Sequence, residues 1–131
     1  MVDSYTFNVD FDGTVVTHEY PFVGRDIGAV PVLKRIVRNG HKLILFTMRS
    51  GFTLDDAVEW FKTNEIPLYG IQTNPTQNSW TTSPKSLADI MIDDSAIGCP
   101  LAYNSNISTR GFVNWVAIEK MLEEQGLLEI K

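Results

Sequence analysis

The sequence predicts a three-layer α/β domain with a mostly parallel central sheet. Short apolar runs, which are typical of buried strands, alternate along the chain with segments whose apolar residues recur at helical spacing. The chain has 131 residues, of which 44% are hydrophobic and 21% are charged. These values suit a soluble domain that can bury its own core. We therefore expect residues 1–131 to form a single domain.

The first predicted strand covers residues 5–11. Aromatic or branched residues alternate there with smaller or polar ones, which is a strand pattern. The strand is expected to end at Asp12-Gly13, because this dipeptide favours a turn. Residues 15–20 follow it and are compatible with a short hairpin arm.

The first predicted helix covers residues 29–39. Its apolar residues recur at helical spacing, Pro31 suits the first turn, and Gly40 suits the C-terminal cap. Residues 42–47 then form a nearly continuous apolar run. Such a run is typical of a strand that is buried on both faces of a parallel sheet.

A second helix is predicted to begin at Thr53 and to end before Pro67. Thr53 is a suitable N-cap residue, and Asp55 and Asp56 would lie in the first turn, near the positive end of the helix dipole. Residues 68–71 then suit a short strand. The alternation of strand and helix therefore continues through the middle of the chain.

The last part of the chain is predicted to contain a loop, a strand and a helix. Residues 73–84 are polar and suit a loop. Residues 88–92 suit a buried strand that ends at Asp93-Asp94, and residues 112–125 show helical spacing. The chain is thus expected to end on a helix.

Polar residues stand where three of these strands end. Asp10, Thr47 and Asp93 follow the apolar runs, and the carboxyl ends of parallel strands meet at one edge of a sheet, where ligands bind. Phosphoryl transfer needs a carboxylate nucleophile, a cation, an acid/base group and donors for the phosphoryl oxygens. The chain offers a candidate for each requirement: Asp10, Asp12, Thr47, Lys85 and the pair Asp93-Asp94.

Four segments in chain order resemble the motifs of the haloacid dehalogenase (HAD) superfamily. Asp10–Thr14 resembles the first motif, Leu43–Thr47 the second, Lys85 the third, and Met91–Asp94 the fourth in its adjacent-acid form. The resemblance covers nearly the whole chain. It implies a Rossmann-like HAD hydrolase core.

The resemblance also implies a role for each matching residue. Asp10 would be the nucleophile and a magnesium ligand. Asp12 would be the general acid/base and would offer its backbone carbonyl to the metal. Thr47 would hydrogen-bond the phosphoryl group, and Lys85 would neutralise Asp10 and the bound phosphate.

The fourth motif would complete the Mg²⁺ site. Either Asp93 or Asp94 is expected to bind the metal directly, because neighbouring side chains at a strand end point in opposite directions. For Arg49, which follows the second motif, two interpretations stay open: a substrate-binding residue that grips phosphate or carboxylate with its planar fork, or a surface arginine. His18 is expected to be a surface residue.

The predicted activity is a magnesium-dependent phosphatase that hydrolyses phosphomonoesters through an aspartyl-phosphate on Asp10. An acid at Asp12 can protonate an alkoxide leaving group, whereas superfamily members that dehalogenate generally lack this acid. Residues 14–47 and 47–85 leave no room for a cap domain. The site would therefore be open to large substrates, or could be covered by a neighbouring subunit in a homo-oligomer.

Two other functions remain open at this point. A receiver-type phospho-acceptor module is also small and acidic, but it carries its acidic pair near the first strand and its acceptor aspartate on the third. A catalytically idle binding protein on the same scaffold is the other alternative, and the intact set of acids argues against it. Turnover separates an enzyme from both.

Composition and net charge limit the binding partners and the cellular location that we expect for this chain. The net charge of −5 argues against strong non-specific binding to nucleic acid. No apolar stretch approaches the length that spans a bilayer, so no membrane partner is expected. The first residues do not resemble a secretory signal, and the single cysteine, Cys99, suits a reducing compartment, so a cytoplasmic location is expected.

Overall fold

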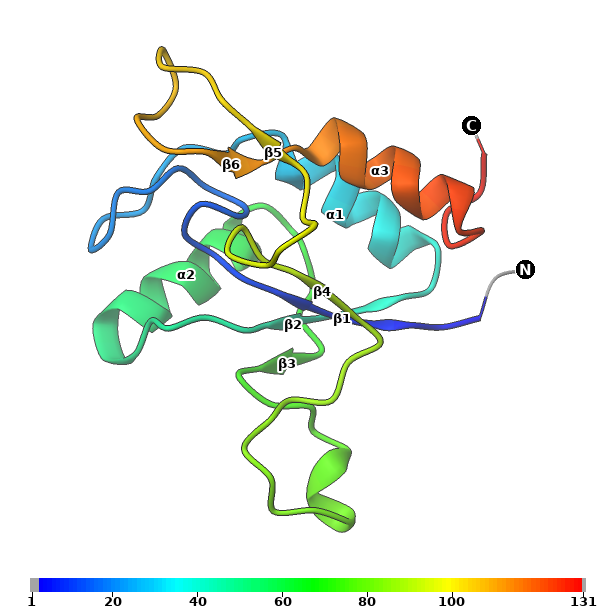
Figure 1. Cartoon of the computed structure of the whole chain (residues 1–131). Coiled ribbons are helices and arrows are strands. Elements are labelled where there is room, and N and C mark those ends of the chain that lie inside the picture. Colours follow the sequence, from blue (N-terminus) through cyan, green and yellow to red (C-terminus); the bar gives the residue numbers. More distant parts are fainter. Residues whose placement is uncertain (1–2, 131) are drawn as a thin grey trace.

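A four-stranded parallel sheet lies at the centre of the computed structural model, which describes residues 3–130. The strands are β1 (Thr6–Val9), β2 (Lys42–Leu45), β3 (Gly70–Ile71) and β4 (Ile90–Ile92). Their order across the sheet is β3-β2-β1-β4 (Figure 1). The chain thus adds strands first on one side of β1 and later on the other. The predicted α/β class and the parallel sheet are confirmed.

The helices of the described chain and one face of the sheet share an apolar core. The helices are α1 (Ala29–Arg38), α2 (Gly51–Thr63) and α3 (Trp115–Glu124). Burying a large apolar side chain stabilises the fold by about 1.5–3 kcal/mol, so this cluster is the main source of stability. Its members from strands and helices include Phe7, Val9, Leu33, Ile36, Leu43, Leu45, Phe61, Ile92, Ile118 and Leu122.

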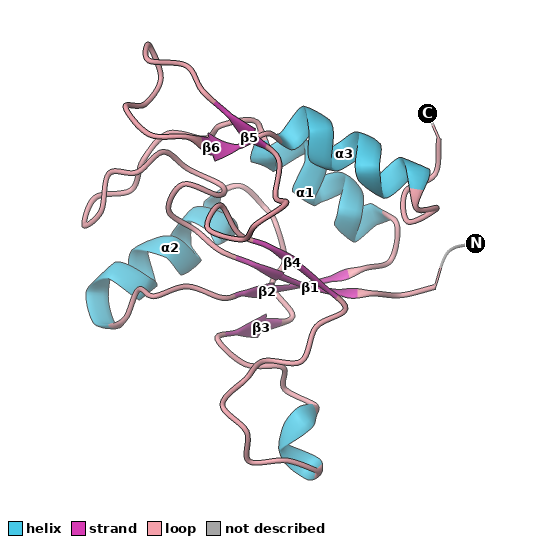
Figure 2. Ribbon diagram, in the orientation of Figure 1, coloured by secondary structure: helices cyan, strands magenta, loops and turns pink. Residues whose placement is uncertain are grey.

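A polar loop covers the other face of the sheet. Side chains alternate along a strand, so Asn8 and Ile44 point away from the helices. Residues 73–88 lie against this face and contain the short 3₁₀ helix η1 (Gln77–Ser79), which is drawn below the sheet in Figures 1 and 2. The third layer in residues 3–130 is therefore an ordered loop rather than a set of helices, and no cap domain is visible there.

The start of α2 differs from the prediction. The helix begins at Gly51 after Ser50, so Thr53 is not the N-cap but lies in the first turn, where its hydroxyl donates to the Ser50 carbonyl at 2.8 Å. Asp55 and Asp56 consequently lie beyond that turn. The difference arises because tertiary contacts, described below, fix the turn that precedes the helix.

The start of α3 also differs. Phe112–Val113, predicted as helix, forms strand β6, which pairs antiparallel with β5 (Leu101–Ala102). The backbone N–H of Val113 donates to the carbonyl of Gly13 at 3.1 Å. The helix begins at Trp115, after Asn114 caps it by accepting from the Ala117 N–H at 3.1 Å. The hydrogen bond from Val113 to Gly13, 100 positions earlier in the sequence, thus keeps Phe112–Val113 extended although the apolar residues of this segment recur at helical spacing.

Residues 15–27 leave the sheet as a hairpin-like excursion without regular strands. The backbone N–H of Thr17 donates to Arg25 at 2.9 Å, and that of Ile27 donates to Val15 at 3.4 Å. The predicted arm therefore exists as a pair of segments in which Val16 forms one isolated antiparallel bridge with Asp26. In residues 3–130 we find no helix of the length and apolarity needed to cross a bilayer.

Candidate functional site

Three carboxylates meet at the carboxyl edge of the sheet. Asp10 follows β1, and Asp93 and Asp94 follow β4; the two strands are in register, with Val9 opposite Ile92. One oxygen from each of the three carboxylates lies within 4.8 Å of the other two. We call Asp10, Asp93 and Asp94 the acidic triad. The convergence expected from the strand ends therefore exists.

Thr14 lies between two members of the triad. Its hydroxyl is 3.1 Å from Oδ2 of Asp10 and 3.2 Å from Oδ1 of Asp94, and it accepts from the Asp94 N–H at 3.1 Å. The side chain is fully buried, and its carbonyl accepts from the indole N–H of Trp115 at 2.6 Å. One hydroxyl proton can serve only one carboxylate at a time, so Thr14 positions the triad without neutralising it.

The surroundings of Asp10 raise the pKa of its carboxyl group. The pKa of Asp10 is raised from 3.8 to about 7, with burial as the largest cause; a backbone hydrogen bond from Phe11 lowers the pKa, and the neighbouring Asp93 and Asp94 raise it. Crowded carboxylates repel one another unless a cation lies among them. Hard oxygen ligands in this arrangement fit Mg²⁺, which binds one or two carboxylates together with water and phosphate oxygens.

Arg49 donates a hydrogen bond to each carboxylate oxygen of Asp12. Nε of Arg49 donates to Oδ2 at 2.8 Å, and Nη2 donates to Oδ1 at 2.6 Å. This parallel, two-point geometry is the strong form of an arginine–carboxylate pair. It raises the pKa of Arg49, with the hydrogen bond to Asp12 as the largest cause. Asp12 therefore enters the site in a fixed orientation.

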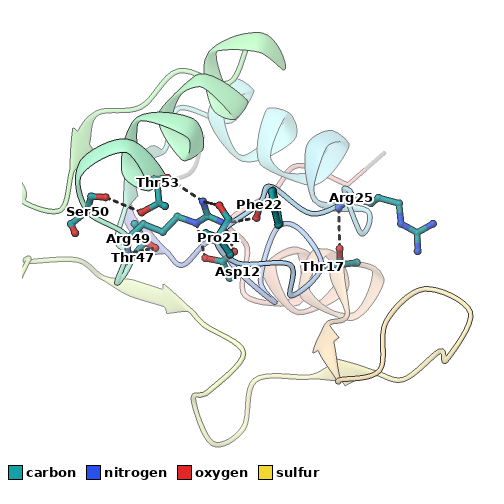
Figure 3. A network of polar contacts seen from close by, with 9 residues as sticks. All are labelled: Asp12, Thr17, Pro21, Phe22, Arg25, Thr47, Arg49, Ser50 and Thr53. Atoms are coloured by element: carbon teal, nitrogen blue, oxygen red, sulfur yellow. Dashed lines mark hydrogen bonds and ion pairs between the residues drawn. The ribbon is translucent and has the colours of Figure 1, made fainter.

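The remaining N–H groups of Arg49 also have partners. Nη1 donates to the carbonyls of Pro21 at 3.4 Å and Thr53 at 3.1 Å, and Nη2 donates to Phe22 at 2.8 Å (Figure 3). The side chain is only 2% exposed, and its guanidinium lies 4.9 Å from the ring centre of Phe11. All five donors of a guanidinium are thus used. Arg49 is therefore not a surface arginine, which corrects that interpretation, and in this structure its donors are engaged by protein acceptors.

Thr47 lies in the predicted place at the end of β2. Its hydroxyl accepts from the Arg49 N–H at 3.1 Å and keeps its own proton to donate. The side-chain amide of Gln72 fixes the backbone here, accepting from the Thr47 N–H at 2.9 Å and donating to its carbonyl at 2.6 Å. Gln72 was not predicted as part of the site.

The structure does not bring Lys85 to the acidic triad. Lys85 lines a separate pocket on the loop-covered face, with Asn8 and Met91, and in the described part of the chain no carboxylate oxygen lies within 4.0 Å of its ammonium. The side chain of Gln77 donates to the Lys85 carbonyl at 2.9 Å, and Ser86 donates to Asn8 at 3.1 Å. These contacts hold the segment beneath the sheet, and motif spacing does not reveal them.

A cavity of about 460 Å³ opens above the triad. His18, which was expected at the surface, is half-buried there, with Nε2 3.2 Å from Oδ2 of Asp94, although the two are not aligned as a hydrogen bond. A Cβ on Gly13 would lie 2.0 Å from Nε2 of His18, so a glycine is needed at this position. We call the cavity above the triad the acid cavity. Its lining residues are Asp10, Asp12, His18, Tyr20, Thr47, Met48, Arg49, Asp93, Asp94, Ser95 and Arg110.

Comparison with known proteins gives one close relative in structure. A solved structure of a conserved protein from Bacteroides thetaiotaomicron is 34% identical to this chain, with a TM-score of 0.78. The match covers 94% of this chain and 93% of that protein. No family model matches the chain, and no curated protein matches it.

Proposed function

For this chain, which belongs to the same family as the conserved Bacteroides thetaiotaomicron protein, we propose a magnesium-dependent phosphatase activity on phosphomonoesters. The observation that carries the proposal is the acidic triad, whose oxygens lie within 4.8 Å of one another in an open cavity. The ordered resemblance to the four HAD motifs gives the reaction type. The proposed setting is the cytoplasm, where a free thiol such as Cys99 stays reduced.

The acidic triad is the proposed metal site. Asp10 would contribute as both ligand and nucleophile, together with Asp93 or Asp94. Bound there, Mg²⁺ would neutralise the carboxylates and the negative charge of the phosphoryl group. Thr14 supports this role because its hydroxyl holds the Asp10 and Asp94 carboxylates toward each other.

In the proposed first half-reaction, an oxygen of Asp10 attacks phosphorus. The bond from phosphorus to the leaving-group oxygen breaks, its electron pair stays on that oxygen, and an aspartyl-phosphate forms on Asp10. The Thr47 hydroxyl, which keeps a free proton, would donate to a non-bridging oxygen as charge develops there. Asp12 would supply the proton that the leaving oxygen takes up.

In the second half-reaction, water attacks phosphorus and gives a proton to Asp12. The bond to Asp10 breaks, inorganic phosphate leaves, and the Asp10 carboxylate is restored. The two-point contact with Arg49 fixes the position of the Asp12 carboxylate that would accept this proton. Donating a proton in the first half-reaction requires that pair to loosen.

Hydrolysis of p-nitrophenyl phosphate tests the proposal. We expect many turnovers per chain with Mg²⁺, loss of activity after exhaustive chelation, and recovery when Mg²⁺ is added back. A receiver-type module would be phosphorylated once, and an idle scaffold would not react. Activity that survives chelation would contradict the metal-dependent mechanism.

A further inference from the structure

The acid cavity contains few cations. The chain has 11 lysines and arginines, but among the cavity-lining residues only Arg49 and Arg110 carry a guanidinium, and none is a lysine. Arg49 uses its donors on Asp12 and on three backbone carbonyls. Among these lining residues, Arg110 is therefore the guanidinium that remains to meet an anionic group on a ligand.

Arg110 is available for such a contact. The residue is exposed, and within residues 3–130 its guanidinium makes no hydrogen bond or ion pair with the protein. Only its backbone is held, by a 3.3 Å hydrogen bond from its N–H to the hydroxyl of Ser108. All five donors of its planar fork are thus free to face a ligand at the mouth of the cavity.

The segment that carries Arg110 is attached to the site on both sides. Three residues after it, the Val113 N–H bonds the Gly13 carbonyl at 3.1 Å. Three residues before it, the Ile107 carbonyl accepts from Nη2 of Arg25 at 2.8 Å, which joins the segment to the 15–27 excursion. In Figure 1 the loop between β5 and β6 runs beside that excursion. Arg110 is therefore held near the cavity mouth although its side chain is exposed.

The size of the acid cavity leaves room for more than a phosphoryl group. Its volume of about 460 Å³ is within the range of small-molecule sites, roughly 300–1,000 Å³. A leaving group bound next to the triad can thus extend to the rim, where Tyr20 and Met48 are exposed. One free guanidinium matches one carboxylate in charge and in two-point geometry, whereas a second phosphate would bring more charge than this single cation balances.

We propose that Arg110 binds a carboxylate on the leaving group, so that the preferred substrates are phosphomonoesters of small hydroxy acids. This inference rests on the proposed phosphatase function, because the ligand is taken to be a phosphomonoester. The contact between Arg110 and a carboxylate is a separate claim that binding alone can test. Arg110 is a specificity residue in this account. No sequence pattern marks Arg110, because it lies in a polar segment outside all four motifs.

The test compares 3-phosphoglycerate with glycerol 3-phosphate, which is similar in size and has a hydroxymethyl group in place of the carboxylate. The kcat/KM for each is measured with Mg²⁺ for wild type, Arg110→Gln and the matched control Arg38→Gln. Arg38 is an exposed arginine at the end of α1 and does not line the acid cavity. We expect wild type to prefer 3-phosphoglycerate, and Arg110→Gln to reduce that preference roughly fivefold, as for a partly exposed ion pair. Arg38→Gln should keep it.

Equilibrium binding separates this inference from the proposed function. Calorimetric titration of the same three proteins with the two compounds, in the presence of Mg²⁺, reports the carboxylate preference even if no compound is hydrolysed. Tighter binding of 3-phosphoglycerate that disappears in Arg110→Gln supports the inference whether or not turnover occurs. Equal binding of both compounds by wild type, or a preference that Arg110→Gln retains, would overturn it.

Discussion

Two polar clusters lie on the same sheet, and they are built in opposite ways. The acid cavity is at the carboxyl edge, whereas the second cluster lies between the sheet and the 73–88 loop. We call the second one the amide cluster; its members are all at most 5% exposed: Asn8, Asn74, Gln77 and Ser86.

In the amide cluster each side chain has protein partners. Gln77 donates to the carbonyls of Ser83 and Lys85 at 3.1 and 2.9 Å and accepts from the Leu87 N–H at 2.8 Å. Asn8 and Ser86 bond each other reciprocally, both at 3.1 Å. Buried polar groups that satisfy one another in this way hold a loop against a sheet and need no ligand.

In the acidic triad the neighbours have the same charge. The pKa of Asp10 is raised to about 7 by burial and then by Asp93 and Asp94, and Thr14 offers a single proton. Such an arrangement is unfavourable for the isolated fold and becomes favourable when a cation binds. The comparison teaches that unbalanced negative charge, rather than the presence of polar groups, distinguishes the candidate site from the amide cluster.

The largest expected effect is that of Asp10→Asn on turnover. An amide cannot form the aspartyl-phosphate, so hydrolysis of p-nitrophenyl phosphate should be abolished, while circular dichroism should show an unchanged fold. Asp55→Asn, which removes an equally charged but exposed side chain on α2, is the matched control and should keep full activity. A pure Asp10→Asn preparation with near wild-type rates would refute the nucleophile assignment.

Asp12→Asn should have the next largest effect. General acid/base groups contribute about 10²–10⁴ in rate, and the loss should be greater for alkyl phosphates than for aryl phosphates, whose leaving groups need less protonation. The kcat for a series of phosphomonoesters, plotted against the pKa of the leaving group, measures this. If the rate falls equally across the series, Asp12 acts only through the geometry of the metal site.

Proton linkage predicts a stability change in the metal-free protein. Asp10 has a pKa of about 7 in the folded state and an ordinary value of 3.8, so the folded state keeps a proton that the unfolded state releases between those pH values. Stability is therefore greatest below about pH 4 for this group and falls as the pH rises to about 7, by up to about 4 kcal/mol.

Urea unfolding with a chelator, from pH 5 to pH 8, checks this prediction. Asp10→Asn removes the titrating group, so its stability should depend less on pH and exceed that of wild type at pH 8. Mg²⁺ should restore wild-type stability there. Parallel pH profiles for the two proteins would show that Asp10 is not perturbed as described.

A smaller effect is expected from Gln77→Ala in the amide cluster. The change leaves the partners of three hydrogen bonds unsatisfied, which should lower the free energy of unfolding by about 1–3 kcal/mol. Turnover per folded molecule should stay within about twofold, because Gln77 does not line the acid cavity. Gln125→Ala, at an exposed position, is the control. A large loss of turnover in folded Gln77→Ala would show that the two clusters are coupled.

The sequence predicted the sheet because buried parallel strands are short apolar runs, and Asp10 and Asp93 could be placed because strand ends share an edge. The local sequence pattern did not predict the structure of residues 112–113 or of the 73–88 loop. The helical spacing of 112–125 runs through Phe112–Val113, and only the long-range bond between Val113 and Gly13 makes this pair a strand. The ordered 73–88 layer likewise depends on side-chain amides whose partners are distant in sequence.

The site residues that sequence reasoning misplaced have the same explanation. Arg49 pairs with Asp12, 37 residues away, and no periodicity indicates that contact. Lys85 matches a motif by spacing, yet Gln77 and Ser86 hold its segment on the other face. His18 reaches Asp94 only because Gly13 has no side chain. The one available local signal was Thr14, a hydroxyl four residues after Asp10.

The most direct test is to find the phosphoryl group on Asp10. Asp12→Asn should slow the second half-reaction, because the attacking water loses its base, and the covalent intermediate should then accumulate. After brief exposure to acetyl phosphate and Mg²⁺, intact-protein mass spectrometry should show one added phosphoryl group, and peptide mapping should place it on Asp10. The double variant Asp10→Asn/Asp12→Asn should show none. A phosphoryl group that persists in the double variant, or maps to another residue, would contradict the account.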